Sequence, residues 1–160
     1  KHHTGRSNVL GFEGGYHGGV LYFGDHREAN VPHDFVIVPF NDIDALEAAK
    51  GAVVNVTSIA GSRVHPFAGA AYSTSKAALA SLTREMAADF GPIGVRVNSI
   101  SPGEIETSIL SPGTEKIIPQ IPQRRLGQPE EVAKAIYFLC TDSSSYVTGA
   151  ELHINGGQHV

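Results

Sequence analysis

Three residues able to do proton chemistry follow one another between positions 58 and 76. Ser58 carries a hydroxyl, Tyr72 a phenol fourteen positions later, and Lys76 an ammonium group four positions beyond that. Residues four positions apart share a face of a helix, so Tyr72 and Lys76 are predicted to project side by side. A free tyrosine has a pKa of about 10 and is a poor base, but a neighbouring ammonium stabilises the phenolate. Such a phenol can give or take a proton while Ser58 holds a substrate oxygen by a hydrogen bond.

The elements that must position these residues are predicted to be a strand, a helix and a second strand. The run AVVNV at 52–56 is apolar and β-branched, which is typical of a buried parallel strand. The pattern turns helical over about 72–90, and Gly91 and Pro92 stop it. The predicted apolar stripe of this helix consists of Leu79, Leu82, Met86 and Phe90. VRVNSI at 95–100 then completes a right-handed strand–helix–strand unit.

The carboxyl ends of the two strands are predicted to meet at one ligand-binding crevice. Ser58 follows the first strand, and the turn Ser101-Pro102-Gly103 follows the second. In open α/β sheets, ligands bind beyond this edge. A lone tyrosine–lysine pair is also common where the tyrosine is a core residue and the lysine is solvated, so the pair alone does not decide the function.

The remaining pattern alternates strands and helices, which predicts an α/β fold in a single domain of 1–160. A helix is expected from Pro129 to Cys140, with acidic residues in its first turn, and a last strand over 151–155. Before position 50 the sequence predicts strands at 20–23 and 34–40 and a short helix at 44–50. A glycine-rich loop is expected between Leu10 and Val20.

The composition favours a soluble globular protein and excludes several partners. Hydrophobic residues make up 41% of the chain, and the net charge is −4. Since there is no basic run, neither nucleic acid nor an anionic membrane is expected as a partner. Cys140 is the only cysteine and the histidines show no ligand spacing, so we expect a cytoplasmic protein without a disulfide or a metal.

Five motifs in order resemble those of the short-chain dehydrogenase/reductase family. They are VVNVTS, AYSTSKAAL, VRVNSISPGEIET, GQPEEVAKAIYFLC and YVTGAELHINGG, and they span residues 50–160. The resemblance implies a Rossmann-like doubly wound parallel sheet and hydride transfer between NAD or NADP and an alcohol or carbonyl substrate. It implies that Tyr72 passes the proton, that Ser58 orients the substrate oxygen, and that Lys76 makes the phenol more acidic. The residues implied to bind the cofactor are Tyr72, Lys76, Pro102, Gly103, Ile105 and Thr107.

The segment 1–49 departs from the family pattern and resembles an abridged nucleotide-binding part, which leaves the sheet incomplete at its N-terminal half. The family's glycine motif has no full counterpart, because His17 stands in the place of the last glycine and Leu10 in that of the threonine. The Asn-Asn-Ala-Gly motif is absent from the sequence. Asp25, at the end of the expected second strand, favours NAD over NADP, although Arg27 weakens that preference.

Two functions therefore stay open: an NAD(P)-dependent oxidoreductase, and a catalytically silent family fragment that serves as an interaction subunit. A related lyase or epimerase also uses this tyrosine–lysine pair. The segment 108–126 is either the family's substrate loop or an ordinary surface excursion. Candidates for lining the substrate crevice are Arg63, His65, Phe67, Glu104 and Glu106. The resemblance also implies a homotetramer or homodimer, formed through the helix and strand at 129–140 and 151–155 and through the helix from Tyr72.

Overall fold

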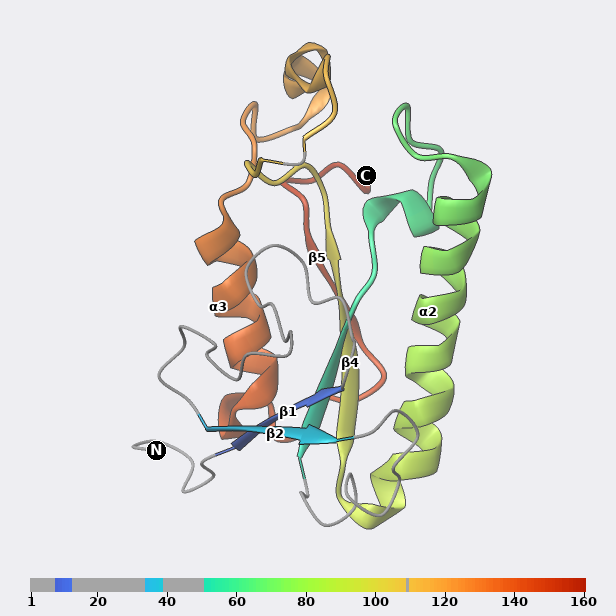
Figure 1. Cartoon of the computed structure of the whole chain (residues 1–160), viewed down its shortest axis with the longest axis vertical. Helices are drawn as coiled ribbons and strands as arrows, with labels where there is room; N and C mark the ends of the chain where they lie inside the picture. The colour runs from blue at the N-terminus through green and yellow to red at the C-terminus, as the bar shows by residue number, and fades with distance from the viewer. Residues whose placement is uncertain (1–7, 13–33, 39–50, 109) are drawn as a thin grey trace.

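The fold is built on three parallel strands with one long helix on each face. The structure is a computed structural model that describes residues 8–12, 34–38, 51–108 and 110–160. The three strands are β3 (Ala52–Val56), β4 (Arg96–Pro102) and β5 (Glu151–Ile154), and the two helices are α2 (Ala70–Phe90) and α3 (Pro129–Cys140). Figure 1 shows the sheet edge-on, with α2 on one side of it and α3 on the other. This arrangement confirms the predicted α/β class.

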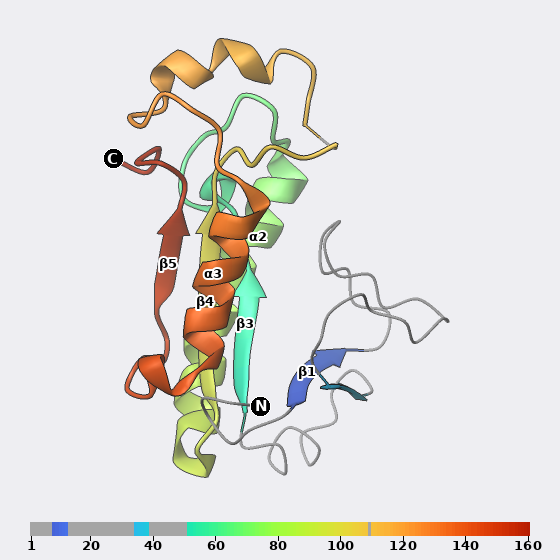
Figure 2. The ribbon, with the colours of Figure 1, turned by 90° about the vertical axis from the view of Figure 1, so that its left-hand side faces the viewer.

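The strand order β3-β4-β5 is parallel throughout, so the three carboxyl ends lie at the same edge. Val54 is in register with Asn98, and Ile100 is in register with Leu152. β4 lies in the centre and runs two residues further than the sequence predicted, because Ser101 and Pro102 also pair with β5. Figure 2 shows the three strands running in one direction beside α3.

The core between α2 and the sheet is small and built from short side chains. Its buried residues are Val53, Ala87, Val95 and Val97. Thr83 is also buried, and its hydroxyl accepts a 2.9 Å hydrogen bond from the Asn55 amide in β3. With small residues at this contact, the helix backbone can lie close to the sheet.

The predicted apolar stripe of α2, which included Leu82, Met86 and Phe90, was partly wrong. Met86 and Phe90 pack against the core as expected. Leu82 is 50% exposed, whereas Thr83 and Ala87 are buried. The row that faces the sheet runs through positions 83 and 87, and Leu82 lies one residue off that row, about 100° around the helix.

A hydroxyl links the outer strands across the central one. The Thr57 Oγ1 atom lies 2.8 Å from the Ile100 carbonyl oxygen and 2.6 Å from a Glu151 carboxylate oxygen. Thr57 follows β3 directly, and Glu151 opens β5. The three strands are thus tied together by side chains as well as by their backbone ladder.

Two further strands, β1 (Asn8–Phe12) and β2 (Asp34–Val38), form a parallel two-stranded sheet. β2 confirms the strand expected over 34–40. β1 corrects the expected loop, because Leu10 and Gly11 are paired in a strand. Glycine tolerates extended backbone, so its presence alone did not mark a turn. The expected strand at 20–23, the helix at 44–50 and Asp25 lie outside the described residues. Within the described part of the chain, neither long helix combines the length and apolarity needed to span a bilayer.

Candidate active site

Ser58 lies in the loop that leaves β3, at the edge where the strand ends converge. It caps the short helix η1 (Ile59–Gly61), and its Oγ atom accepts a 3.2 Å hydrogen bond from the Ala60 amide. This contact fixes the hydroxyl oxygen but leaves its own proton free to donate. The Ser58 hydroxyl is therefore available to donate to a ligand, and its role toward a substrate oxygen stays a prediction.

Gly61 brings this loop into contact with α2. A Cβ atom at Gly61 would come within 2.9 Å of the Ala77 amide nitrogen and of the Lys76 carbonyl carbon. Real side chains essentially never approach backbone this closely, so only glycine allows η1 to pack here. The close approach sets the Ser58 loop directly against the helical turn that carries Lys76.

Lys76 is held between the strand end and the phenol ring. Its Nζ atom donates a 2.9 Å hydrogen bond to the Val56 carbonyl and lies 5.6 Å from the centroid of the Tyr72 ring. This is within the range of cation–π contact. Burial lowers the pKa of Lys76 from its ordinary value of 10.5. The structure thus brings the tyrosine and lysine together on one helix face.

The phenol of Tyr72 is open to solvent. Tyr72 lies in the first turn of α2 and is 48% exposed. Its hydroxyl has no hydrogen-bond partner among the residues that the structure describes. A phenol sealed in the core could not meet a substrate, whereas this one can.

The turn after β4 supplies the other residues predicted to bind a cofactor. Pro102 ends the strand, and the Gly103 amide donates a 3.1 Å hydrogen bond to the Ile154 carbonyl. Ile105 forms an isolated parallel bridge with Gly127. The Ile105 amide and the exposed Thr107 hydroxyl have no protein acceptor or donor in the described ranges. Both groups are thus available to a ligand at the carboxyl edge of the parallel sheet, which is where ligands bind in open α/β folds.

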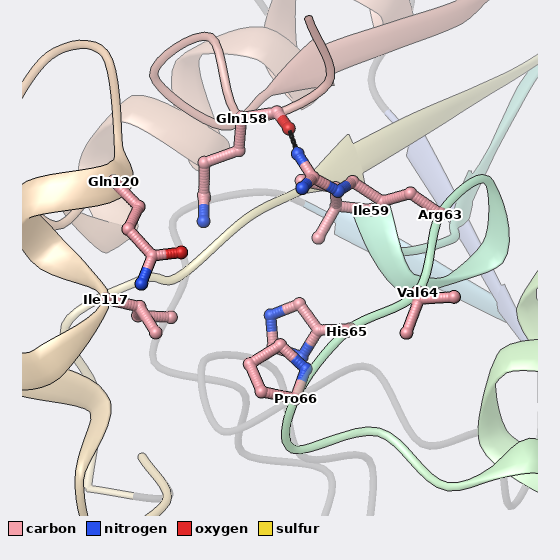
Figure 3. Close-up of a pocket in the computed structure, with 8 residues that line it drawn as sticks. All are labelled: Ile59, Arg63, Val64, His65, Pro66, Ile117, Gln120 and Gln158. Atoms are coloured by element: carbon pink, nitrogen blue, oxygen red, sulfur yellow. Dashed lines mark hydrogen bonds between the residues drawn. The ribbon is translucent and has the colours of Figure 1, made fainter.

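A cavity separates the loop after β3 from the segment predicted to cover the substrate (Figure 3). Its walls come from that loop, from 108–126 and from the stretch after β5. The lining residues are Ile59, Arg63, Val64, His65, Pro66, Ile117, Gln120 and Gln158. Arg63 and His65 thus lie where the sequence placed them. Segment 108–126 contains two short helices, η3 (Thr114–Lys116) and η4 (Ile118–Gln120), and it is anchored by buried Ile117 and Ile121.

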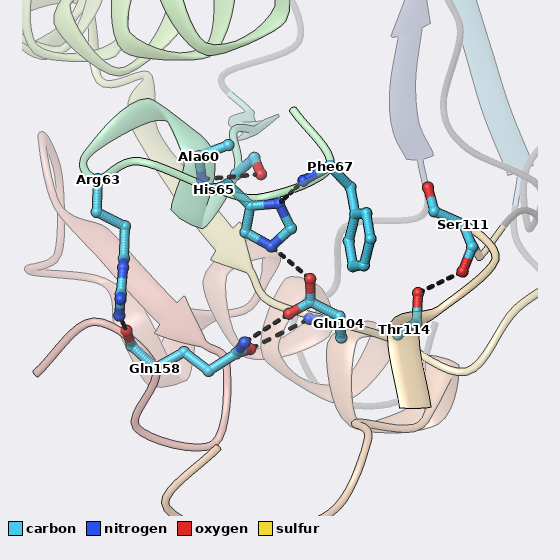
Figure 4. A network of polar contacts seen from close by, with 9 residues as sticks. Ala60, Arg63, His65, Phe67, Glu104, Ser111, Thr114 and Gln158 are labelled. Carbon is cyan, nitrogen blue, oxygen red and sulfur yellow. Dashed lines mark hydrogen bonds and ion pairs between the residues drawn. The ribbon is translucent and has the colours of Figure 1, made fainter. Parts of the chain in front are cut away.

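The other expected lining residues are placed differently. Glu104 is buried and contacts His65 and Gln158 (Figure 4), and it lines a different cavity, together with Gln123 and His153. Phe67 packs edge-on against the His65 ring. Glu106 turns to the start of α3, where it accepts a 2.7 Å hydrogen bond from the Gln128 side chain. Gln158 was missed by the sequence interpretation, because nothing in its local pattern marks it.

Most of the chain matches known proteins. The family model described as Enoyl-(Acyl carrier protein) reductase matches residues 40–159. Protein FixR of Bradyrhizobium diazoefficiens is 68% identical over 118 residues, covering 73% of this chain and 42% of FixR. The 3-oxoacyl-[acyl-carrier-protein] reductase FabG of Aquifex aeolicus is 41% identical over 138 residues, covering 81% of this chain and 54% of FabG.

Solved structures agree with the sequence matches. A 3-oxoacyl-[acyl-carrier protein] reductase with bound NAD from Brucella melitensis has a TM-score of 0.69 at 34% identity, covering 74% of this chain and 45% of its own. A short-chain dehydrogenase/reductase from Brucella ovis has a TM-score of 0.55 at 65% identity, covering 71% of this chain and 46% of its own. The chain spans about half the length of the relatives it matches. From the family match over 40–159 and the Rossmann-fold neighbours, the chain belongs to the short-chain dehydrogenase/reductase family.

Proposed function

We propose that this chain carries the catalytic part, residues 50–160, of an NAD(P)-dependent oxidoreductase acting on an alcohol or carbonyl substrate. The observation that carries the proposal is the placement of the Lys76 ammonium, 5.6 Å from the Tyr72 ring centroid and hydrogen-bonded to the end of β3. Ser58 lies on the loop that packs against the same helical turn. The Tyr72 phenol, the Lys76 ammonium and the Ser58 hydroxyl are thus all positioned at the carboxyl edge of the sheet.

Three residues act on the substrate oxygen and its proton in this reaction. When bound, a nicotinamide would supply the hydride for reduction of the carbonyl carbon or accept it in oxidation of the alcohol carbon. In reduction, Tyr72 donates its phenolic proton to the carbonyl oxygen, and the alcohol forms without net charge. Ser58 donates a hydrogen bond to the same oxygen and orients it. Lys76 stabilises the phenolate left on Tyr72, which regains its proton from solvent.

The nicotinamide end of the cofactor fits the turn after β4. The Ile105 backbone and the Thr107 hydroxyl would bind the carboxamide, and Pro102 and Gly103 would border the ring. Lys76 would bond the ribose. NAD is the favoured cofactor, in line with the Brucella melitensis relative with bound NAD and with Asp25 in the sequence. We further propose a homodimer or homotetramer in the reducing cytosol, with Cys140 as a free thiol.

Cofactor binding tests this function directly. NAD and NADP are added separately to the full chain, and its melting temperature is followed. A ligand at a hundred times its Kd stabilises the folded state by about 2.7 kcal/mol, so a clear rise is expected with NAD. No rise with either dinucleotide at millimolar concentration would overturn the proposal.

The second candidate is a catalytically silent subunit. It is favoured by the sequence before position 50, where the family's glycine motif is incomplete and its Asn-Asn-Ala-Gly motif is absent. The same titration separates the two, because a silent subunit that binds no dinucleotide shows no shift. If the chain binds NAD but turns over no alcohol, the silent role is the better account.

A further inference from the structure

Glu104 is a buried carboxylate at the start of the turn that faces the proposed cofactor site. It is 8% exposed. One carboxylate oxygen contacts His65 Nε2, and the other accepts a 2.5 Å hydrogen bond from the Gln158 side-chain amide. The Glu104 backbone amide in turn donates a 3.3 Å hydrogen bond to the Gln158 side-chain oxygen. A buried carboxylate is tolerated only when it is hydrogen-bonded in this way, and bonds to a charged acceptor are the stronger kind.

These three residues come from three separate segments, as Figure 4 shows. His65 belongs to the loop after β3, which also carries Ser58. Glu104 follows β4, and Gln158 follows β5. Arg63, two positions before His65, donates a hydrogen bond to the Gln158 carbonyl. The network therefore ties the Ser58 loop to the turn after β4 through the stretch after β5.

The turn itself is packed against that same stretch. A Cβ atom at Gly103 would lie 2.8 Å from the Asn155 Cβ, so the backbone there has no room for a side chain. The stretch after β5 also holds the end of segment 108–126, because the Gln123 amide donates a 3.1 Å hydrogen bond to the Gly156 carbonyl. The stretch after β5 thus contacts both the turn, through Gln158, and the end of segment 108–126, through Gly156.

We propose that Glu104 is a positioning residue. Through Gln158 and His65 it fixes the turn 102–107 relative to Ser58, and so sets where the Ile105 and Thr107 groups meet the nicotinamide. This inference rests on the proposed function. It assigns Glu104 no contact with the reacting atoms, since one carboxylate oxygen accepts from Gln158 and the other lies against His65.

An exchange of the two partners tests the contact. Glu104→Gln keeps an acceptor oxygen but removes its charge, so the contact becomes a weaker neutral amide–amide bond, and Gln158→Glu sets two carboxylates at the 2.5 Å contact. Each single variant therefore loses the charge-assisted bond. The double variant Glu104→Gln/Gln158→Glu restores it with donor and acceptor reversed, and the new carboxylate still accepts from the backbone amide of residue 104. Glu85→Gln, an exposed position on α2, makes the same chemical change away from the network and is the matched control.

The first measurement needs no cofactor. Hydrogen exchange of the residue 104 amide reports the contact directly, because this amide donates to Gln158. We expect exchange to be roughly tenfold faster in each single variant, as for the loss of one charge-assisted hydrogen bond, and close to wild type in the double variant and in Glu85→Gln. A double variant that exchanges as fast as the single variants would overturn the proposal.

The second measurement separates positioning from stability alone. NAD affinity and kcat should both fall roughly tenfold in the single variants and recover in the double variant, at a temperature where all variants are folded. If exchange changes as expected while NAD affinity and kcat stay at wild-type values, the positioning role is overturned and the proposed function stands. If wild type itself binds no dinucleotide, the proposed function fails, and the positioning role fails with it.

Discussion

Lys76 donates a 2.9 Å hydrogen bond to the carbonyl of Val56, the last residue of β3. This hydrogen bond anchors the ammonium to the sheet and restricts the motion of the Lys76 side chain. Its place beside Tyr72 is fixed by the strand end as well as by the helix. A shift of the Val56 carbonyl would therefore move the Lys76 charge relative to the Tyr72 ring.

Tyr72→Phe should abolish turnover while leaving the fold intact. The substitution removes only the hydroxyl, which makes no hydrogen bond within the described residues. Proton transfer by a positioned side chain contributes roughly 10²–10⁴-fold, so kcat should fall by that factor. The measurement is steady-state reduction of a carbonyl substrate, with NAD-induced thermal shift as the check on binding. Near wild-type turnover would show that the phenol has another role.

Lys76→Ala should lower both turnover and cofactor affinity. The variant loses the charge beside Tyr72 and the group proposed to bond the ribose. Dinucleotide titration and kcat measured on the same preparation distinguish the two effects. Unchanged values for both would mean that Lys76 only fastens the helix to β3.

The partly buried ammonium of Lys76 also predicts a pH dependence of stability. Burial lowers the pKa of Lys76 in the folded state below its ordinary value of 10.5. The folded state therefore releases this proton more readily than the unfolded state, and the free energy of unfolding rises with pH between those two values. Lys76→Met should remove that rise. Urea titrations between pH 8 and about 10.5 check the sign, and an equal rise in the variant would contradict the assignment.

Gly61→Ala should destabilise the protein and disturb the site together. The new Cβ would lie 2.9 Å from backbone atoms of Lys76 and Ala77, and overpacking of this kind costs about 1–3 kcal/mol. Gly91→Ala is the matched control, because Gly91 has helical backbone angles and open space around it. That change should stabilise by about 0.4–1 kcal/mol. Equal effects of both substitutions on the free energy of unfolding would refute the close packing of η1 on α2.

Acid should weaken the start of α3. The hydrogen bond from Arg125, followed by that from the Gln128 amide, lowers the pKa of Glu131 to about 2. This carboxylate therefore stabilises the fold above its unfolded pKa of about 4.3, and the contribution is lost as the pH falls toward 2. Glu131→Gln should flatten the stability profile in that window, whereas Glu130→Gln should not. The check is thermal unfolding from pH 6 to about pH 2.

The sequence predicted an element well where the residues that define it, such as the two members of a helix cap, lie close together in the chain. α3 begins at Pro129 as expected, with Gln128 and Glu131 forming a reciprocal cap. The face of α2 was harder, because the choice of buried row depends on Asn55, which lies 28 positions from its partner Thr83. In the site, Tyr72 and Lys76 could be paired from helical spacing alone. Gln158 could not be found, since its contact with Glu104 spans 54 positions.

The hydrogen bond between Thr57 and Glu151 joins residues 94 positions apart. To form this bond and the parallel pairing of β4 with β5, the chain must close long loops, and this slows folding. Chains dominated by such distant pairings fold on the scale of milliseconds to seconds, much slower than helical bundles. During synthesis on the ribosome, β3 and β4 emerge well before β5. Until β5 arrives, the central strand has one unpaired edge, and an exposed edge of this kind favours aggregation.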